Sequence, residues 1–191
     1  MKKITYFAEL SKLFPQIEAV DKNNRSIALE AAITRSIQLI LAQYKKGNKL
    51  IFIGNGGSAS IASHFAIDFL KNARIPALAF NDASFLTCLS NDLGYEQVFA
   101  KPIEMLAKKG DILVAISSSG KSKNILEATR MAKKKGCLVI TLSGFNSSNP
   151  LRKLGDLNFY VPSNSYGYVE TIHAAICHCI VDTIINKKSH G

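Results

Sequence analysis

The chain has 191 residues, of which 47% are hydrophobic and 20% are charged, and this fits one globular domain with a sizeable core. It has no run of 18 apolar residues that could span a membrane, and Glu9 and Lys12 interrupt the apolar stretch that a signal peptide would need, so we expect a cytoplasmic protein. The net charge of +10 is densest at 133–135, but no aromatic residues are interleaved there to stack on bases, so we expect binding neither to nucleic acid nor to a membrane.

Two amphipathic helices are predicted at the start of the chain. The first covers 4–18 and stops near Pro15, and the second covers 24–46 and ends at Gly47, because glycine is common just after a helix. Both are apolar on one side. We expect them to pack on the rest of the domain or on another subunit.

From residue 48 onward, predicted strands alternate with predicted helices. The strands are 49–53, 77–80, 111–116, 137–142 and 158–161, and the helices are 58–71, 83–91, 95–107, 123–135 and 168–185. Strands separated by such helices imply right-handed parallel crossovers. The sequence therefore predicts one α/β domain over 1–191, with N-terminal helices in 1–47 and a core in 48–191. This core is a doubly wound five-stranded parallel sheet with helices on both faces.

Two polar loops follow predicted strands, at the edge where open parallel sheets bind ligands. The first is the glycine loop, Gly54-Asn55-Gly56-Gly57-Ser58, in which three residues without a Cβ let the backbone approach a ligand closely. The second is the serine loop, Ser117-Ser118-Ser119-Gly120-Lys121-Ser122, which leads into a helix N-terminus. Unpaired N–H groups and the helix dipole favour an anion there, and hydroxyls add further donors.

Each loop alone also has a purely structural interpretation. A glycine-rich turn can be only a tight turn, and serines cap helices. Neither loop matches GxGxxG or the full P-loop pattern, because Ala115 stands where the first P-loop glycine belongs. Together, at the ends of two strands, the loops favour a phosphate other than that of a nucleotide.

Ile53-Gly54-Asn55-Gly56-Gly57-Ser58-Ala59, then Asn91-Asp92, then Ile116 with the serine loop, resemble the flavodoxin-like SIS (sugar isomerase) fold. Over nearly the whole chain, the residues look most like the phosphoheptose isomerases, which convert sedoheptulose 7-phosphate to D-glycero-D-manno-heptose 7-phosphate for surface-glycan or lipopolysaccharide precursors. The resemblance implies homotetramers whose sites are shared between subunits. It implies that the phosphate is held by Ser117, Ser118, Ser119 and Ser122, and that the sugar is lined by Asn55, Gly56, Gly57, Ser58, Asn91, Asp92 and Glu170.

A second set of residues is a candidate for metal binding and acid–base chemistry. His64 and Asp68 lie four apart on one predicted helix, and Glu170 and His178 lie eight apart on another, about 80° apart in projection. Two imidazoles and two carboxylates suit a divalent ion such as zinc. His173 is left out of this set, as a supporting or core residue.

The family resemblance implies zinc at these matching positions, two of which supply base and acid. This chain departs from the family pattern, because Asp68 stands where the family carries Glu and Glu170 where it carries Gln. We expect aldose–ketose isomerisation through an enediol, with Asp68 or Glu170 as the base and His178 as the acid.

Two other functions remain open. A non-catalytic SIS protein could sense a sugar phosphate or organise a partner, as one relative that binds a replication initiator does, but that relative lacks the histidine matching His178. The chain could also isomerise a different phosphosugar, because the residues at 68 and 170 could retune the same pocket.

Overall fold

Short, largely apolar segments form the five parallel strands that the sequence predicts. The computed structural model describes residues 5–189. In it the parallel strands are β3 (Leu50–Ile53), β4 (Ala77–Ala79), β5 (Ile112–Ser117), β6 (Leu138–Gly144) and β7 (Leu157–Val161). They lie in the order β7-β6-β5-β3-β4. Numbered along the chain, this is the 2-1-3-4-5 order of flavodoxin-like folds, so the predicted architecture is confirmed.

Within residues 5–189, however, the sheet has seven strands rather than five. The sheet continues past β7 with two antiparallel strands, β1 (Glu18–Asp21) and β2 (Ser26–Ile27). Sequence periodicity could not predict them. β1 is four residues long with no apolar alternation, and its backbone groups are satisfied by pairing with β7.

The N-terminal helices are therefore shorter than predicted. α1 spans Tyr6–Leu13 and is followed by a single 3₁₀ turn, Phe14–Gln16, that contains Pro15. The second helix, α2, begins at Leu29 rather than near 24 and ends at Tyr44. The residues between the two helices form β1, β2 and the turn that joins them.

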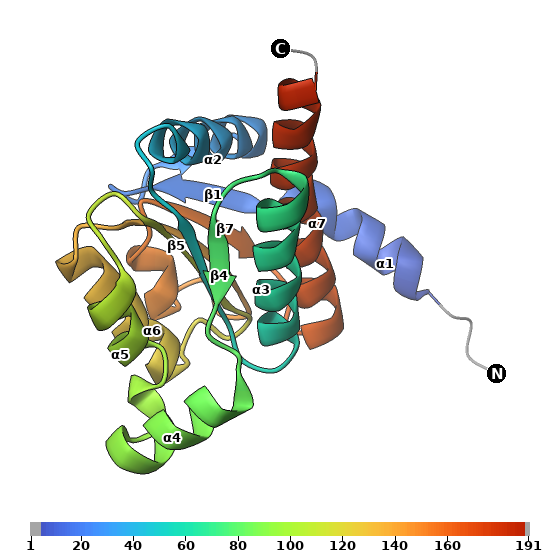
Figure 1. Cartoon of the computed structure of the whole chain (residues 1–191). Helices are drawn as coiled ribbons and strands as arrows, with labels where there is room; N and C mark the ends of the chain where they lie inside the picture. The colour runs from blue at the N-terminus through green and yellow to red at the C-terminus, as the bar shows by residue number, and fades with distance from the viewer. Residues whose placement is uncertain (1–4, 190–191) are drawn as a thin grey trace.

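Helices cover both faces of the sheet, because the side chains of each strand alternate between two cores. Leu50 and Phe52 of β3 point into a core with α2, α3 (Gly57–Ile67) and α7 (Tyr166–Ser189). Ile51 and Ile53 point to the opposite face, into a core with α5 (Ala100–Leu106) and α6 (Lys123–Lys134). Figure 1 shows α3 and α7 side by side on the first face, with α5 and α6 on the other.

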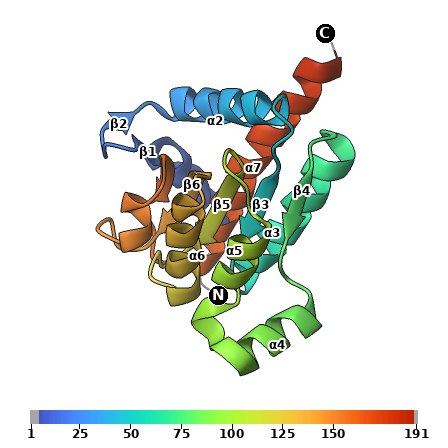
Figure 2. The ribbon, with the colours of Figure 1, turned by 60° about the vertical axis from the view of Figure 1, so that its left-hand side comes forward.

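Between β4 and α5 the chain leaves the body of the molecule. α4 (Ala83–Leu93) has no buried residue and projects at the lower end of both views (Figures 1 and 2). The predicted helix 95–107 is split into a 3₁₀ turn, Tyr95–Gln97, and α5. The break lies before α5. Pro102 does not interrupt α5, because it occupies the first turn, where a helix needs no backbone N–H donor.

The last helix, α7, is long and apolar enough to cross a membrane, if it is judged only by its length and its mean hydropathy of 1.3. In this structure it packs against α2 and α3. Six of its aliphatic side chains belong to the core beneath these helices, namely Val169, Ile172, Ile176, Ile180, Val181 and Ile184. We interpret it as the central core helix of this face.

Candidate active site

The glycine and serine loops meet where the strand order reverses. β3 and β5 are parallel neighbours, while β4 lies beyond β3 and β6 beyond β5. The connections after these two strands therefore run apart and open a crevice at their carboxyl ends. A cavity of about 360 Å³ lies there. Its wall is formed by both loops and the start of α7: Asn55, Gly56, Gly57, Ser58, Ile116, Ser117, Ser118, Ser119, Ser122, Tyr166 and Glu170.

The serine loop presents hydroxyl groups to this cavity. Gly120 has a φ of 62°, and a Cβ there would collide with the side-chain amide of Asn149, so glycine fits this turn best. Ser122 precedes α6 without capping it through its side chain. Ser118 Oγ is buried and has no hydrogen-bond partner within 5–189. A buried hydroxyl without a partner costs free energy, and a ligand oxygen in the cavity would remove that cost.

The glycine loop brings the N-terminus of α3 to the opposite wall. Gly56 has a φ of 53°, and α3 begins at Gly57. A Cβ on Gly57 would collide with the carboxylate of Glu170, so this carboxylate packs directly on bare backbone. Partial burial raises the pKa of the Glu170 carboxyl. The cavity therefore combines uncharged donors with one ionisable acid.

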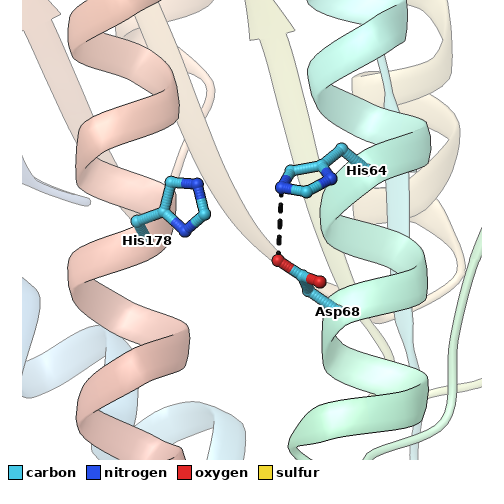
Figure 3. Close-up of side chains that lie close together, drawn as sticks. All are labelled: His64, Asp68 and His178. Carbon is cyan, nitrogen blue, oxygen red and sulfur yellow. Dashed lines mark ion pairs between the residues drawn. The ribbon is translucent and has the colours of Figure 1, made fainter.

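A second group of side chains lies where α3 packs on α7. His64, Asp68 and His178 each offer a ligand atom, and these atoms all lie within 4.8 Å of one another. Figure 3 shows the two rings and the carboxylate facing the space between the helices. His64 Nε2 is 3.3 Å from Asp68 Oδ2. Two imidazoles and a carboxylate are a donor set that zinc accepts, so this His–Asp cluster could hold a divalent ion.

The conformation of the chain at Asp68 differs from an ideal helix. α3 continues into one π-helical turn, Asp68–Asn72, a feature that is common at functional sites. Asn72 Nδ2 donates to Asp68 Oδ1 at 3.0 Å, while the other carboxylate oxygen faces His64. This contact fixes the orientation of the Asp68 carboxylate.

The structure brings most, but not all, of the predicted site residues together. Glu170 lies in the wall of the cavity and is not part of the His–Asp cluster. It is separated from His178 by about 12 Å along the axis of α7. Asn91 and Asp92 are exposed on α4, hydrogen bond to each other, and do not line the cavity of their own chain.

His173, between Glu170 and His178 on α7, is a core residue. Its side chain is fully buried, and Nε2 donates to the backbone oxygen of Ser143 at 3.1 Å. Burial lowers the pKa of His173 from 6.5 to about 4, so the ring is neutral near pH 7. Of the two roles considered for His173, packing in the core is the one that the structure supports.

Sequence reasoning missed three residues around these sites. Tyr166 lines the cavity, Asn72 contacts Asp68, and Asn124 hydrogen bonds to Asn55. Of these, only Asn124 could have been found from the sequence. It is a polar residue two positions after the serine loop, and this places it in the first turn of the following helix, close to the loop. The other two depend on how α3 and α7 fold in space.

Known proteins match this chain over most of its length. The SIS domain family matches residues 6–144. A phosphoheptose isomerase of Aliarcobacter butzleri is 37% identical over 168 residues, covering 85% of this chain and 88% of that protein. One from Cytophaga hutchinsonii is 36% identical and covers 93% of both. The solved structure of a phosphoheptose isomerase from Francisella tularensis superimposes with a TM-score of 0.83 at 32% identity, covering 96% of this chain and 95% of that one.

The fold, the position of the cavity and the similar proteins all indicate the same family. The parallel sheet has the predicted order, and the two loops that carry the resemblance line one cavity at its switch point. The matches extend well beyond those loops, to nine-tenths or more of the chain in the longest of them. The chain therefore belongs to the phosphoheptose isomerase family of SIS-domain enzymes.

Proposed function

We propose that this enzyme interconverts sedoheptulose 7-phosphate and D-glycero-D-manno-heptose 7-phosphate through an enediol intermediate, in the synthesis of heptose precursors for surface glycans. One observation carries the proposal. In a chain of this family, the buried hydroxyl of Ser118 lacks a partner within 5–189 at a cavity formed by the two loops. A phosphate oxygen is the acceptor that this hydroxyl and the adjacent helix N-terminus favour.

The serine-loop wall of the cavity would hold the phosphate with uncharged groups only. Ser117, Ser118, Ser119 and Ser122 supply hydroxyls, and α6 supplies backbone N–H groups. On the opposite wall, Gly56 lets the sugar approach the backbone, while the space beside Gly57 is taken by the Glu170 carboxylate. Hydroxyl and amide donors bind a dianion while leaving the acid–base work to groups elsewhere in the site.

Proton transfer would use the ionisable groups on α3 and α7. Asp68 or Glu170 removes the proton from the carbon next to the carbonyl, and His178 returns one to the neighbouring carbon. Asn72 and His64 orient the carboxylate of Asp68. Glu170 has a raised pKa because it is partly buried, which strengthens it as a base. Asp68 can pair with His178 of the same chain, whereas Glu170, about 12 Å from His178 along α7, can pair only with the histidine of another subunit. With that condition, both carboxyls stay candidates for the base.

A divalent ion such as zinc fits the His–Asp cluster by donor chemistry. When bound, such an ion supplies Lewis-acid stabilisation of the developing oxyanion. His64, Asp68 and His178 would hold it. Glu170 would join them only through a movement of its side chain or through another subunit, because it lines the cavity wall in this chain.

A cytoplasmic homotetramer with shared sites is the form that the family resemblance implies. The exposed α4 supports sharing, because none of its residues is buried and its Asn91 and Asp92 do not reach the cavity of their own chain. In a tetramer, these residues would complete the cavity of a neighbouring subunit. The His–Asp cluster that serves a cavity could likewise come from the same chain or from a neighbour.

The decisive experiment is turnover of sedoheptulose 7-phosphate by the purified protein, followed by NMR, with and without a chelator. Asp68→Asn and Glu170→Gln test the base, and the true base variant should lose about 10²–10⁴-fold in kcat. Asp182→Asn, an exposed change on α7 outside both sites, is the matched control. Atomic emission spectroscopy of wild type and His64→Ala measures the amount of bound metal independently of activity.

The possible outcomes separate the alternatives. If Asp68→Asn and Glu170→Gln both keep full activity, the acid–base assignment is wrong. Tight binding of the sugar phosphate without turnover would favour a sensor. Turnover of another ketose phosphate but not of sedoheptulose 7-phosphate would favour a different isomerase.

A further inference from the structure

Asn124 is a buried polar residue that lies behind the wall of the cavity. It sits in the first turn of α6, is 2% exposed, and is not among the residues that line the cavity. Its amide group exchanges two hydrogen bonds with the amide of Asn55. Asn55 Nδ2 donates to Asn124 Oδ1 at 2.9 Å, and Asn124 Nδ2 donates to Asn55 Oδ1 at 2.9 Å.

Further contacts fix the orientation of this amide pair. Asn124 Oδ1 also accepts from the backbone N–H of Ile125 at 3.0 Å, and Asn55 Oδ1 also accepts from the hydroxyl of Tyr95 at 3.1 Å. The side-chain oxygen of Asn55 thus has two donors already. It has no free lone pair for a sugar hydroxyl, although Asn55 lies in the cavity wall.

The pair joins the two walls of the cavity. Asn55 belongs to the glycine loop after β3, and Asn124 belongs to the helix that the serine loop enters after β5. The glycine loop has a large backbone freedom of its own, because glycines at 54, 56 and 57 lose much conformational entropy when they are ordered. A contact that orders this loop before the ligand arrives reduces the entropic cost of binding.

We propose that Asn124 is a positioning residue that, through Asn55, holds the glycine loop and the serine loop at the separation that a phosphate ester requires. We call these two residues the amide clamp. The proposal rests on the proposed function only for the nature of the ligand, and it does not depend on which group moves the proton. Asn124 itself touches no ligand atom and acts only through Asn55.

The test is a double-mutant cycle on the affinity for inorganic phosphate, measured by calorimetric titration. Asn124→Leu keeps the volume of the buried side chain but removes both hydrogen bonds of the clamp, and Asn55→Ala removes the partner. Each should raise the Kd by about tenfold, the equivalent of one or two hydrogen bonds. Because the two residues act as one unit, the double variant should also show about a tenfold loss rather than about a hundredfold one.

Two further variants keep the test falsifiable. Tyr95→Phe changes an exposed residue and removes only the hydroxyl that donates to Asn55, so the Kd should rise about two- to threefold with the fold intact. Thr129→Ala removes a buried hydroxyl from the middle of the same helix, where it bonds to Ile125, and should leave the Kd unchanged. Thermal unfolding of every variant checks that it is folded.

The results distinguish a failure of the clamp from a failure of the proposed function. Wild-type phosphate affinity in Asn124→Leu, or effects that multiply in the double variant, would overturn the clamp. In the isomerase assay, Asn124→Leu should raise KM about tenfold with kcat within about threefold of wild type. If the wild-type enzyme binds phosphate but does not turn over sedoheptulose 7-phosphate, the proposed function fails while the phosphate cycle still decides the clamp.

Discussion

The cavity at the switch point and the His–Asp cluster differ in how the sequence builds them. The serine loop that lines the cavity is six consecutive residues, and its hydroxyls lie at the end of one strand and the start of one helix. The cluster combines α3 with α7, more than a hundred residues apart, and two of its three side chains are exposed. Anion binding is thus encoded locally, whereas the acid–base group depends on how two helices pack.

The chemistry of the two regions differs in the same way. The serine loop offers hydroxyl and backbone N–H donors, whose protonation does not change near neutral pH. The cluster consists of ionisable groups, which can move a proton or hold a metal ion. A change in the first region should therefore alter affinity, and a change in the second should alter turnover.

The largest expected effect is in the cluster. His178→Gln keeps a polar side chain but removes the proposed acid, so kcat should fall by about 10²–10⁴-fold in the isomerase assay. The Kd for inorganic phosphate, measured by calorimetry, should stay within about twofold, because the serine loop is unchanged. Cys179→Ser, at the next and also exposed position of α7, is the control and should retain wild-type kcat. A phosphate Kd that rises in step with the loss of kcat would mean that the two regions are not separable.

A smaller effect is expected from His173, which ties the helix shared by both regions to the sheet. Burial lowers the pKa of His173 from 6.5 to about 4, so the unfolded chain binds a proton between these pH values and the folded chain does not. His173 alone therefore lowers the free energy of unfolding by about 3 kcal/mol as the pH drops from about 6.5 to about 4. Above pH 6.5 the ring is neutral in both states, and none of this stability is lost.

Denaturant unfolding at a series of pH values measures this effect. His173→Leu should be less stable at pH 7, because it loses the hydrogen bond to Ser143, but its stability should depend less steeply on pH below 6.5. Ile172→Val, the neighbouring buried change, should lower stability by about 1 kcal/mol equally at every pH. Equal slopes in wild type and His173→Leu would show that the folded protein accommodates the protonated ring.

The parts of the fold that follow local patterns could be predicted from sequence. The predicted strands 49–53 and 111–116 each contain a continuous apolar run, 50–53 and 112–116, between turn signals, and both are present in a parallel pair. β1 could not be predicted, because its stability comes from pairing with β7, about 140 residues away, and not from its own residues. α4 was predicted as a helix, but its lack of any fully buried residue depends on where the chain leaves the sheet.

The same distinction applies to the candidate site. Ser117, Ser118, Ser119 and Ser122 could be grouped from the sequence, because a strand followed by a helix fixes the loop between them. The helical spacing of His64 and Asp68 also predicted their contact. The spacing of Glu170 and His178 gave their common face and a separation of about 12 Å along α7. It did not give the elements that pack around each of them, so it could not show that Glu170 reaches the cavity and not the cluster.

The smallest of these effects tests the cavity itself. Ser118→Ala removes a buried hydroxyl that has no partner among the described residues, so the free protein loses no hydrogen bond and should be as stable as wild type or slightly more stable. The complex does lose one, and the Kd for inorganic phosphate should rise about tenfold with kcat nearly unchanged. Ser60→Ala, an exposed change on α3 outside the cavity wall, should alter neither quantity. If Ser118→Ala instead lowers stability and leaves the phosphate Kd unchanged, this hydroxyl serves the fold and not the ligand, and the assignment of the serine loop as the anion-binding region loses its main support.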